Sequence, residues 1–460
     1  MTELAARIRT RDLSPVEVTE HYLRRATDRG DQVGAFFTIA ADQALDQARE
    51  AEKAVGAGED KPLLGVPIPV KDLNFVAGLP ITLGSALFKD FIAPQDDHVA
   101  MAIRASGAVI YGKTATPEFG LPCYTETDVG APARTPWDLT RSAGGSSGGA
   151  AAAVAAGLAP AAQGSDGGGS IRIPASVCGL FGIKPTRGRV SEGPLLPDLA
   201  GLSVSGPIAR TVADAALLLD VLAGNHPGDM YTLPKPDRPF LIHASTEPPR
   251  LRIARTLDHA VEGADVHPDC VRAYEDASAL LAELGHDVED VASPFDSGTV
   301  RHFETLWYAM AMLAPVDASS EPRLRPLTRY LRERGAAISA AQLMEAQAAL
   351  QSATRTALTA LSGYDAILTP TLAQPPAKVG WFEEVDPAEN FERQKAFTPY
   401  TAVYNVSGQP AVSVPLYWNP AGLPIGVMLA GRMGEEATLI ELAAQLERAR
   451  PWRDRHPPVW

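Results

Sequence analysis

Hydrophobic and polar positions follow two patterns along the chain, one typical of helices and one typical of strands. The segment Ser14–Glu17 has a capping Ser, a Pro at the first helical position and a Glu three residues after the cap, which predicts the start of a helix. A second helix is predicted over 42–55, where Ala, Glu and Gln dominate. A β-branched run at 64–71, bounded by Gly and Pro, predicts a strand. Residues 1–60 are therefore expected to form a helical segment that precedes a sheet.

Helices and strands are predicted to alternate over the rest of the chain. A helix over 99–105 is followed by a strand over 108–113, and this order is typical of α/β layer folds. The other predicted elements are helices over 150–157, 211–223, 268–283 and 435–448, a mostly helical stretch over 303–361, and strands over 251–254, 287–291, 366–369 and 411–414. Because no internal repeat and no polar linker interrupts the pattern, we predict one large domain over 1–460.

Composition and charge narrow the class of protein. The chain has 460 residues, of which 45% are apolar and 21% charged, as in a globular protein and unlike a disordered chain or a coiled coil. Asp+Glu (55) exceeds Lys+Arg (41), which gives a net charge of −14 and argues against nucleic-acid or anionic-membrane binding. The first residues contain no apolar signal core, and the longest apolar stretch, Ala150–Ala162, holds Gly and Pro. We therefore expect a cytoplasmic protein that does not cross a membrane.

Metal and disulfide chemistry are not indicated. Cys123, Cys178 and Cys270 are an odd, sparse set that matches neither a disulfide framework nor a zinc motif. None of the nine His lies in a His-Glu-x-x-His motif, so a zinc hydrolase is not expected. We predict no metal site.

Two Gly/Ser clusters, at 144–149 and 164–170, flank an Ala-rich segment. A flexible linker is one interpretation, but apolar and small residues adjoin both clusters. A phosphate-binding loop is excluded because no Lys-Ser or Lys-Thr pair follows the glycines, and the spacing is a weak match to a dinucleotide fingerprint. The third interpretation is an oxyanion hole beside a nucleophile, since consecutive glycines let several backbone N–H groups point into one concavity. That interpretation makes Ser170 the candidate nucleophile.

A nucleophilic serine needs a base, and Lys71 at the end of an apolar strand is the better candidate than any His. To accept a proton, Lys71 must be neutral, which burial in an apolar pocket can achieve. The alternatives are a surface lysine or a structural ion pair with Asp72. Ser146, in the first glycine cluster, is positioned to relay the proton between Ser170 and Lys71.

Several motifs in order resemble the amidase signature family. They are Gly65-Val66-Pro67 with Lys71-Asp72; Gly112-Lys113-Thr114 with Pro117-Glu118; Arg141–Gly149; Asp166 with Gly168–Ala175; Cys178-Gly179; and Gly182–Thr186. The resemblance is strong over 60–220, moderate at 1–60 and 365–460, and weak between about 225 and 365. It implies a catalytic core at 61–220, a variable helical and βαβ segment at 225–365, and a C-terminal part, 366–460, that belongs to the same sheet. The implied fold is α/β, with a mixed, mostly parallel central sheet of about ten strands covered by helices on both faces.

The resemblance also implies site residues. Ser170 is the nucleophile, Ser146 the bridging serine after a cis peptide bond, and Lys71 the general base and acid. The implied oxyanion hole consists of the N–H groups of Gly167, Gly168, Gly169 and Ser170, and the implied supporting residues are Ser147, Asp166 and Arg172. This chain departs from the family at Gly167, where Thr or Ile is common, which implies a looser loop and a roomier pocket.

The implied activity is hydrolysis of a carbon–nitrogen acyl bond through an acyl-enzyme, with water and without any cofactor. Carbamates and esters have similar carbonyls and are expected as further substrates. One alternative is the ammonia-releasing component of a tRNA-dependent amidotransferase, which passes ammonia from glutamine to its partners, but the C-terminal stretch 404–411 is more similar to stand-alone amide and urethane hydrolases of the family. A non-catalytic binding protein is a third alternative, although every triad position is intact. For assembly, the resemblance suggests a homodimer without specifying it.

The substrate pocket is expected to draw on variable segments. The candidate segments are Leu121–Thr127, Ser191–Leu202, Leu306–Leu313 and Gly380–Phe382, and the candidate residues are Tyr124, Thr125, Trp307, Trp381, Asn405 and Gln409. Apolar and aromatic residues dominate these segments, which favours a neutral or apolar amide. Trp307 and Trp381 are equally consistent with core packing, and Asn405 and Gln409 with turn capping.

Overall fold

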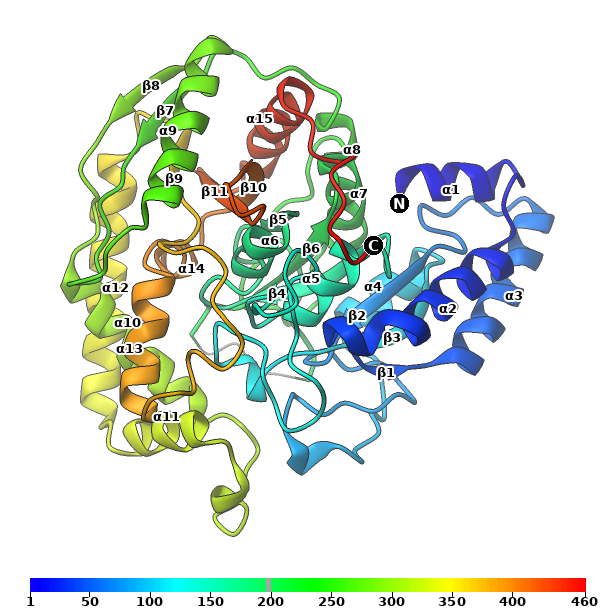
Figure 1. Cartoon of the computed structure of the whole chain (residues 1–460), viewed down its shortest axis with the longest axis horizontal. Helices are drawn as coiled ribbons and strands as arrows, with labels where there is room; N and C mark the ends of the chain where they lie inside the picture. The colour runs from blue at the N-terminus through cyan, green and yellow to red at the C-terminus, as the bar shows by residue number, and fades with distance from the viewer. Residues whose placement is uncertain (196–199) are drawn as a thin grey trace.

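In residues 1–195 and 200–460, which the computed structural model describes, strands form one eight-stranded and one three-stranded sheet (Figure 1). The strands are β1 (Phe36–Ile39), β2 (Pro67–Lys71), β3 (Val109–Thr114), β4 (Ala161–Asp166), β5 (Phe181–Lys184), β6 (Val204–Ala209), β7 (Arg252–Arg255), β8 (Asp287–Asp290), β9 (Ala366–Pro370), β10 (Ala411–Trp418) and β11 (Pro424–Gly431). The large sheet has the order β4-β6-β5-β10-β11-β9-β7-β8, and the small sheet has the order β1-β3-β2.

Helices surround both sheets. They are α1 (Thr2–Arg9), α2 (Pro15–Val33), α3 (Ala41–Ala57), α4 (His98–Ala105), α5 (Gly148–Ala155), α6 (Arg172–Cys178), α7 (Val212–Leu222), α8 (Phe240–His243), α9 (Pro268–Glu283), α10 (Ser297–Ala311), α11 (Pro326–Ala336), α12 (Ala340–Ala360), α13 (Pro387–Phe397), α14 (Val403–Ser407) and α15 (Glu436–Ala449), with short 3-10 turns at Ala86–Phe88, Glu118–Gly120 and Glu321–Arg323. Among these helices, none is long and apolar enough to span a lipid bilayer.

The α/β class and the mixed sheet are confirmed, but the predicted strand directions are wrong. In the large sheet only β7 pairs in parallel, with β8 and with β9, while the other described pairs are antiparallel. Helices cover both faces, so strands such as β4 and β6 are buried along their whole length. Fully buried strands have the same apolar pattern in parallel and antiparallel sheets, and the sequence pattern therefore does not distinguish the two.

The large sheet is the middle layer of the fold. α7, α9 and α15 pack on one face and contribute to the largest apolar cluster, while α5 and α6 pack on the other face. α5 is almost entirely Ala and Gly and fully buried, so its backbone lies close to the sheet. α10–α13 gather at one side of the molecule, and α1–α3 with the small sheet lie at the opposite side (Figure 1).

The end of β2 lies beside β4, which joins the two sheets. At this junction the backbone N–H of Lys71 donates to the side-chain Oε1 of Gln163 at 2.9 Å, in place of a backbone carbonyl. β2 ends at Lys71 and β4 ends at Asp166, so the junction brings two predicted site segments together. The predicted helical segment 1–60 also needs a correction, because β1 lies within it and pairs with β3.

Candidate active site

Lys71 is fully buried, and two serines contact its ammonium nitrogen. Nζ lies 2.8 Å from Ser146 Oγ and 3.0 Å from Ser165 Oγ. Burial lowers the pKa of Lys71 to about 7, although Asp166 and Glu192 act in the opposite direction. Near neutral pH a large share of this lysine is therefore in the neutral form that accepts a proton.

The ion pair between Lys71 and Asp72, one of the alternatives considered for this lysine, does not form. Asp72 instead pairs with the buried Lys113 at 2.9 Å and also accepts the N–H of Thr82 at 2.9 Å. Lys113 is held in addition by the carbonyl of Asn74 at 2.7 Å. The partner of Asp72 is therefore Lys113 on β3, and Lys71 contacts hydroxyls rather than a carboxylate.

Ser146 follows a cis peptide bond from Gly145, at the start of the loop that leads into α5. Gly145 lies so close to the backbone of Tyr124 that a Cβ would come within 2.7 Å of the Tyr124 nitrogen. Thr125 fixes the same loop, because its Oγ1 donates to the carbonyl of Gly144 at 2.9 Å. Tyr124 and Thr125 thus constrain the two glycines that precede Ser146.

Ser147 connects the loops that carry Ser146 and Ser170. Its Oγ donates to the carbonyl of Ser165 at 3.1 Å and accepts the N–H of Ser165 at 3.2 Å. Its own N–H donates to the carbonyl of Ser170 at 3.2 Å. The two Gly/Ser clusters, which α5 separates in the sequence, are therefore hydrogen-bonded to each other in the fold.

Ser170 is 7% exposed and lines a pocket, immediately before α6. In the described part of the chain the N–H groups of Gly167, Gly168 and Ser170 donate to no protein acceptor. The N–H of Gly169, predicted as a fourth oxyanion donor, does not fit that role, because it donates to Asp166 Oδ1 at 2.7 Å. Gly169 instead serves the turn, where φ is +134° and a Cβ would come within 2.5 Å of Thr401 Oγ1.

Asp166 and Arg172 form a fully buried ion pair that shapes the loop around Ser170. Arg172 reaches both carboxylate oxygens, at 2.9 and 3.0 Å, while Asp166 Oδ2 also accepts the N–H of Ile171 at 3.1 Å. Burial would raise the pKa of Asp166, but Arg172, together with Lys184 and Asn405, outweighs it and holds this pKa well below the usual range. Asn405 completes the cluster, since its Nδ2 donates to Asp166 Oδ1 at 2.9 Å and its Oδ1 accepts from Arg172 at 2.7 Å.

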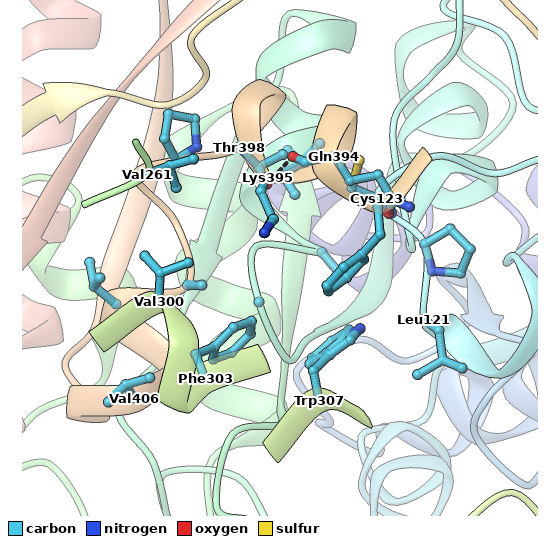
Figure 2. A pocket seen from close by; sticks show the side chains of 18 of the residues that line it. Leu121, Cys123, Val261, Val300, Phe303, Trp307, Gln394, Lys395, Thr398 and Val406 are labelled. Atoms are coloured by element: carbon cyan, nitrogen blue, oxygen red, sulfur yellow. Dashed lines mark hydrogen bonds between the residues drawn. The ribbon is translucent and has the colours of Figure 1, made fainter. Parts of the chain in front are cut away.

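The pocket in front of Ser170 lies between α10 and α13 (Figure 2). Its volume is about 90 Å³. Since a cavity needs roughly 10–15 Å³ to hold one water molecule, this pocket accommodates a short chain of atoms. The lining residues are mostly apolar: Leu121, Pro122, Cys123, Gly168, Ser170, Ile173, Val261, Thr299, Val300, Phe303, Trp307, Phe391, Gln394, Lys395, Thr398, Pro399, Ala402, Val403 and Val406. Phe303 and Trp307 stack with centroids 5.4 Å apart and form one wall.

Of the six predicted pocket residues, Trp307 alone lines this pocket. Tyr124 stacks on Phe382 and Trp381 lies under Arg393, so both belong to the packing behind the pocket. Thr125 and Asn405 instead hydrogen-bond the loops that carry Ser146 and Ser170. Gln409 donates to the carbonyl of Gly431 at 2.8 Å, away from Ser170. The predicted segment Ser191–Leu202 includes residues 196–199, which lie outside the described residues.

Sequence reasoning missed Ser165, Phe303 and Lys395. Ser165 was visible within the second Gly/Ser cluster, but nothing in the pattern assigned it to Lys71. Phe303 lies one helical turn before Trp307, so the four-residue spacing of α10 was the available signal. Lys395 belongs to no sequence motif. It reaches the pocket because α13 lies beside α10 in the fold, and the sequence pattern does not predict that contact. In the described ranges no group of three or more His, Cys, Asp or Glu side chains is arranged to hold a metal ion.

Known proteins resemble this chain both in sequence and in fold. The family model described as Amidase matches residues 17–440. The 6-aminohexanoate-cyclic-dimer hydrolase of Paenarthrobacter ureafaciens is 35% identical, over 100% of this chain and 96% of that protein. The solved structure of a 6-aminohexanoate cyclic dimer hydrolase with substrate superposes with a TM-score of 0.92 at 32% identity, over 100% of this chain and 98% of that one. A bacterial aryl acylamidase of the amidase signature family gives 0.87 at 28% identity, over 97% and 95%. The chain therefore belongs to the amidase signature family and is an amide-hydrolysing enzyme.

Proposed function

We propose that the enzyme hydrolyses the C–N bond of small, neutral amides through an acyl-enzyme on Ser170, with Ser146 and Lys71 as the proton relay. The observation that carries this proposal is the buried contact of 2.8 Å between Lys71 Nζ and Ser146 Oγ. A buried lysine with a pKa of about 7 is suited to taking a proton and returning it near neutral pH.

In the first step Ser170 Oγ attacks the substrate carbonyl, and its proton passes to Ser146 while the Ser146 proton passes to Lys71. Negative charge develops on the carbonyl oxygen, and N–H donors that await it stabilise it by about 2.7–4 kcal/mol each. Gly167, Gly168 and Ser170 supply the unengaged N–H groups beside the nucleophile. The tetrahedral intermediate then collapses, and the leaving amine takes the proton back from Lys71 through Ser146.

In the second step water attacks the Ser170 ester. The same relay accepts a proton from the water and returns it to Ser170 Oγ as the acid product leaves. The reaction needs no external base, because Lys71 is neutral at the start and at the end of each half-reaction. Carbamates and esters present a similar carbonyl and are expected to react by the same route.

The substrate class follows from the pocket. Its walls are aromatic and aliphatic, with Phe303, Trp307 and Phe391 near the nucleophile, so an apolar acyl group gains from burial there. The relative from Paenarthrobacter ureafaciens is named for hydrolysis of a cyclic amide dimer, and a structural neighbour is named an aryl acylamidase, which supports a stand-alone amide hydrolase.

The test is release of amine from a panel of aryl amides, aliphatic amides, carbamates and esters, with Ser170→Ala as the paired control. We expect turnover in the wild type that falls by a factor of about 10³ or more in the variant. Turnover that survives in Ser170→Ala would contradict the assignment of the nucleophile. Inactivity on the whole panel, with ammonia released from glutamine once amidotransferase partner proteins are added, would favour the amidotransferase alternative.

A further inference from the structure

One charged group lines the pocket among the described residues, the ammonium of Lys395, and two carboxylates hold it. Lys395 Nζ lies 2.5 Å from Glu304 Oε1 and 2.7 Å from Glu392 Oε1. Glu304 belongs to α10 and Lys395 to α13, so this ion pair bridges the two walls. Figure 2 shows Lys395 reaching toward the aromatic side chains of Phe303 and Trp307 on the opposite wall.

The cluster carries more negative than positive charge. One ammonium and two carboxylates sum to a net charge of −1. Burial alone would lower the pKa of Lys395, but hydrogen bonds to Glu304 and Glu392 raise it, so the ammonium stays charged and engaged. The side chains of Lys395 and Glu304 are each only 18% exposed, so water screens this pair poorly, whereas Glu392 is 60% exposed and its charge is screened more strongly. Glu304 and Glu392 lie behind Lys395 and do not line the pocket themselves. A carboxylate entering the pocket would therefore find its natural partner, the Lys395 ammonium, already engaged by two carboxylates.

Among the described residues, the rest of the pocket lining offers such an anion no second positive charge. The walls near Ser170 are Phe303, Trp307 and Phe391, and the rings of Phe303 and Trp307 lie against the glycine loop, Gly167–Gly169, which directly precedes Ser170. A Cβ placed on Gly168 would be 3.5 Å from Phe303, and one placed on Gly167 would be 3.6 Å from Trp307. An acyl group held at the proposed oxyanion donors would therefore begin in contact with these rings, in a pocket that Lys395 also lines.

We propose that Glu304, Glu392 and Lys395 act together as a charge filter, which selects amides with a slender apolar acyl group and rejects those whose acyl group ends in a carboxylate. Discrimination arises from the repulsive element as much as from the apolar fit. The inference rests on the proposed function, because it takes the pocket in front of Ser170 as the acyl site.

The test compares three p-nitroanilides, hexanoyl, adipamoyl and adipoyl, by release of p-nitroaniline. Adipamoyl and adipoyl have nearly the same shape and differ in charge at the far end. We expect kcat/KM for adipoyl to be at least tenfold below that for adipamoyl in the wild type. Equal values, or a preference for adipoyl, would overturn the proposal.

Two variants and one control locate the effect. In Glu304→Gln/Glu392→Gln the ammonium is released and the net charge becomes positive, so the ratio is expected to move at least tenfold toward adipoyl. Lys395→Met leaves both carboxylates and is expected to keep or deepen the rejection. Glu389→Gln, on the same helix but paired with Arg393 at 3.7 Å, is expected to leave the ratio unchanged. A ratio that does not respond to the double variant would refute the filter.

A binding measurement without turnover tests the charge filter independently of the proposed reaction. Calorimetric titration of Ser170→Ala with the same three compounds reports the charge preference of the pocket without turnover. If the adipoyl anilide binds tenfold more weakly than the adipamoyl anilide, the result supports the charge filter even if the reaction assignment is wrong. If the adipoyl anilide binds as tightly or more tightly, the result overturns the filter. Hydrolysis that persists in Ser170→Ala would count against the nucleophile and leave the binding result to decide the filter.

Discussion

At the scale of single residues, the proposed chemistry depends most on the protonation of Lys71. The amine must be neutral to accept the proton relayed from Ser170, and its pKa is about 7 because it is buried. Below that pKa the amine is protonated and the relay is blocked. Above it the relay is open.

The first prediction is therefore a kcat/KM that rises about tenfold per pH unit at acidic pH and levels off above a pKa of about 7. Initial rates on a neutral anilide across this range give the profile. Lys71→Ala should lose activity by about 10²–10⁴ and lose this limb of the profile. A wild-type profile that is flat through pH 7 would show that Lys71 is not the base.

A second prediction separates Asn405 from Gln409, both predicted from sequence as pocket residues. Asn405 hydrogen-bonds Asp166 and Arg172 behind Ser170, so Asn405→Ala leaves buried partners unsatisfied at about 1–3 kcal/mol each. We expect a lower thermal midpoint and a lower kcat. Gln409→Leu removes a bond to Gly431 instead and should lower the midpoint while kcat is retained. Equal effects of both variants on kcat would contradict a positioning role for Asn405.

At the scale of elements, α10 and α13 line the pocket in front of Ser170, so we expect them to determine which acyl groups fit. Trp307 lies on α10 beside the glycine loop, whereas Trp381 packs on Phe382 outside the pocket. Trp307→Ala should therefore lower kcat/KM for slender acyl groups by about tenfold and raise the relative rate of bulky ones, since pocket contacts are worth about 1–3 kcal/mol per methylene. Rates on a series of acyl anilides measure this. Trp381→Ala is the matched control and should preserve the ranking; a ranking unchanged in Trp307→Ala would remove α10 from the acyl site.

Element prediction from the sequence succeeded where periodic or apolar residues mark an element and failed where the residues of a strand are small and polar. The helix predicted over 268–283 matches α9, and the strand predicted over 366–369 lies within β9. β4 was missed because its sequence, Ala161–Asp166, contains Gly, Ser and Gln and lacks the β-branched residues of an ordinary strand. The glycine motifs predicted which loops carry the site, but the pocket depends on how α10 meets α13, and spacing along one chain contains no signal for that contact.

At the scale of the whole molecule, a second buried lysine with a lowered pKa makes stability depend on pH. Lys184 is fully buried, and burial, with a smaller effect from Arg172, lowers its pKa to about 7. Between that value and the ordinary lysine pKa of about 10.4, the unfolded chain binds a proton that the folded chain does not. The free energy of unfolding therefore rises with pH over this window.

The corresponding prediction concerns Lys184→Met, which removes this titration. The difference in unfolding free energy, wild type minus variant, should increase above pH 7 by at most about 1.4 kcal/mol per pH unit. Urea unfolding of both proteins at several pH values from neutral to alkaline measures it. A difference that stays constant over this window would mean that Lys184 remains charged in the folded protein.

An acyl-enzyme on Ser170 can be detected by mass spectrometry of the enzyme quenched during turnover of an activated acyl substrate. We expect an added mass equal to the acyl group, located on the peptide that contains Ser170 and absent in Ser170→Ala. An unmodified enzyme under burst conditions, or an acyl group on Ser146 in place of Ser170, would contradict it.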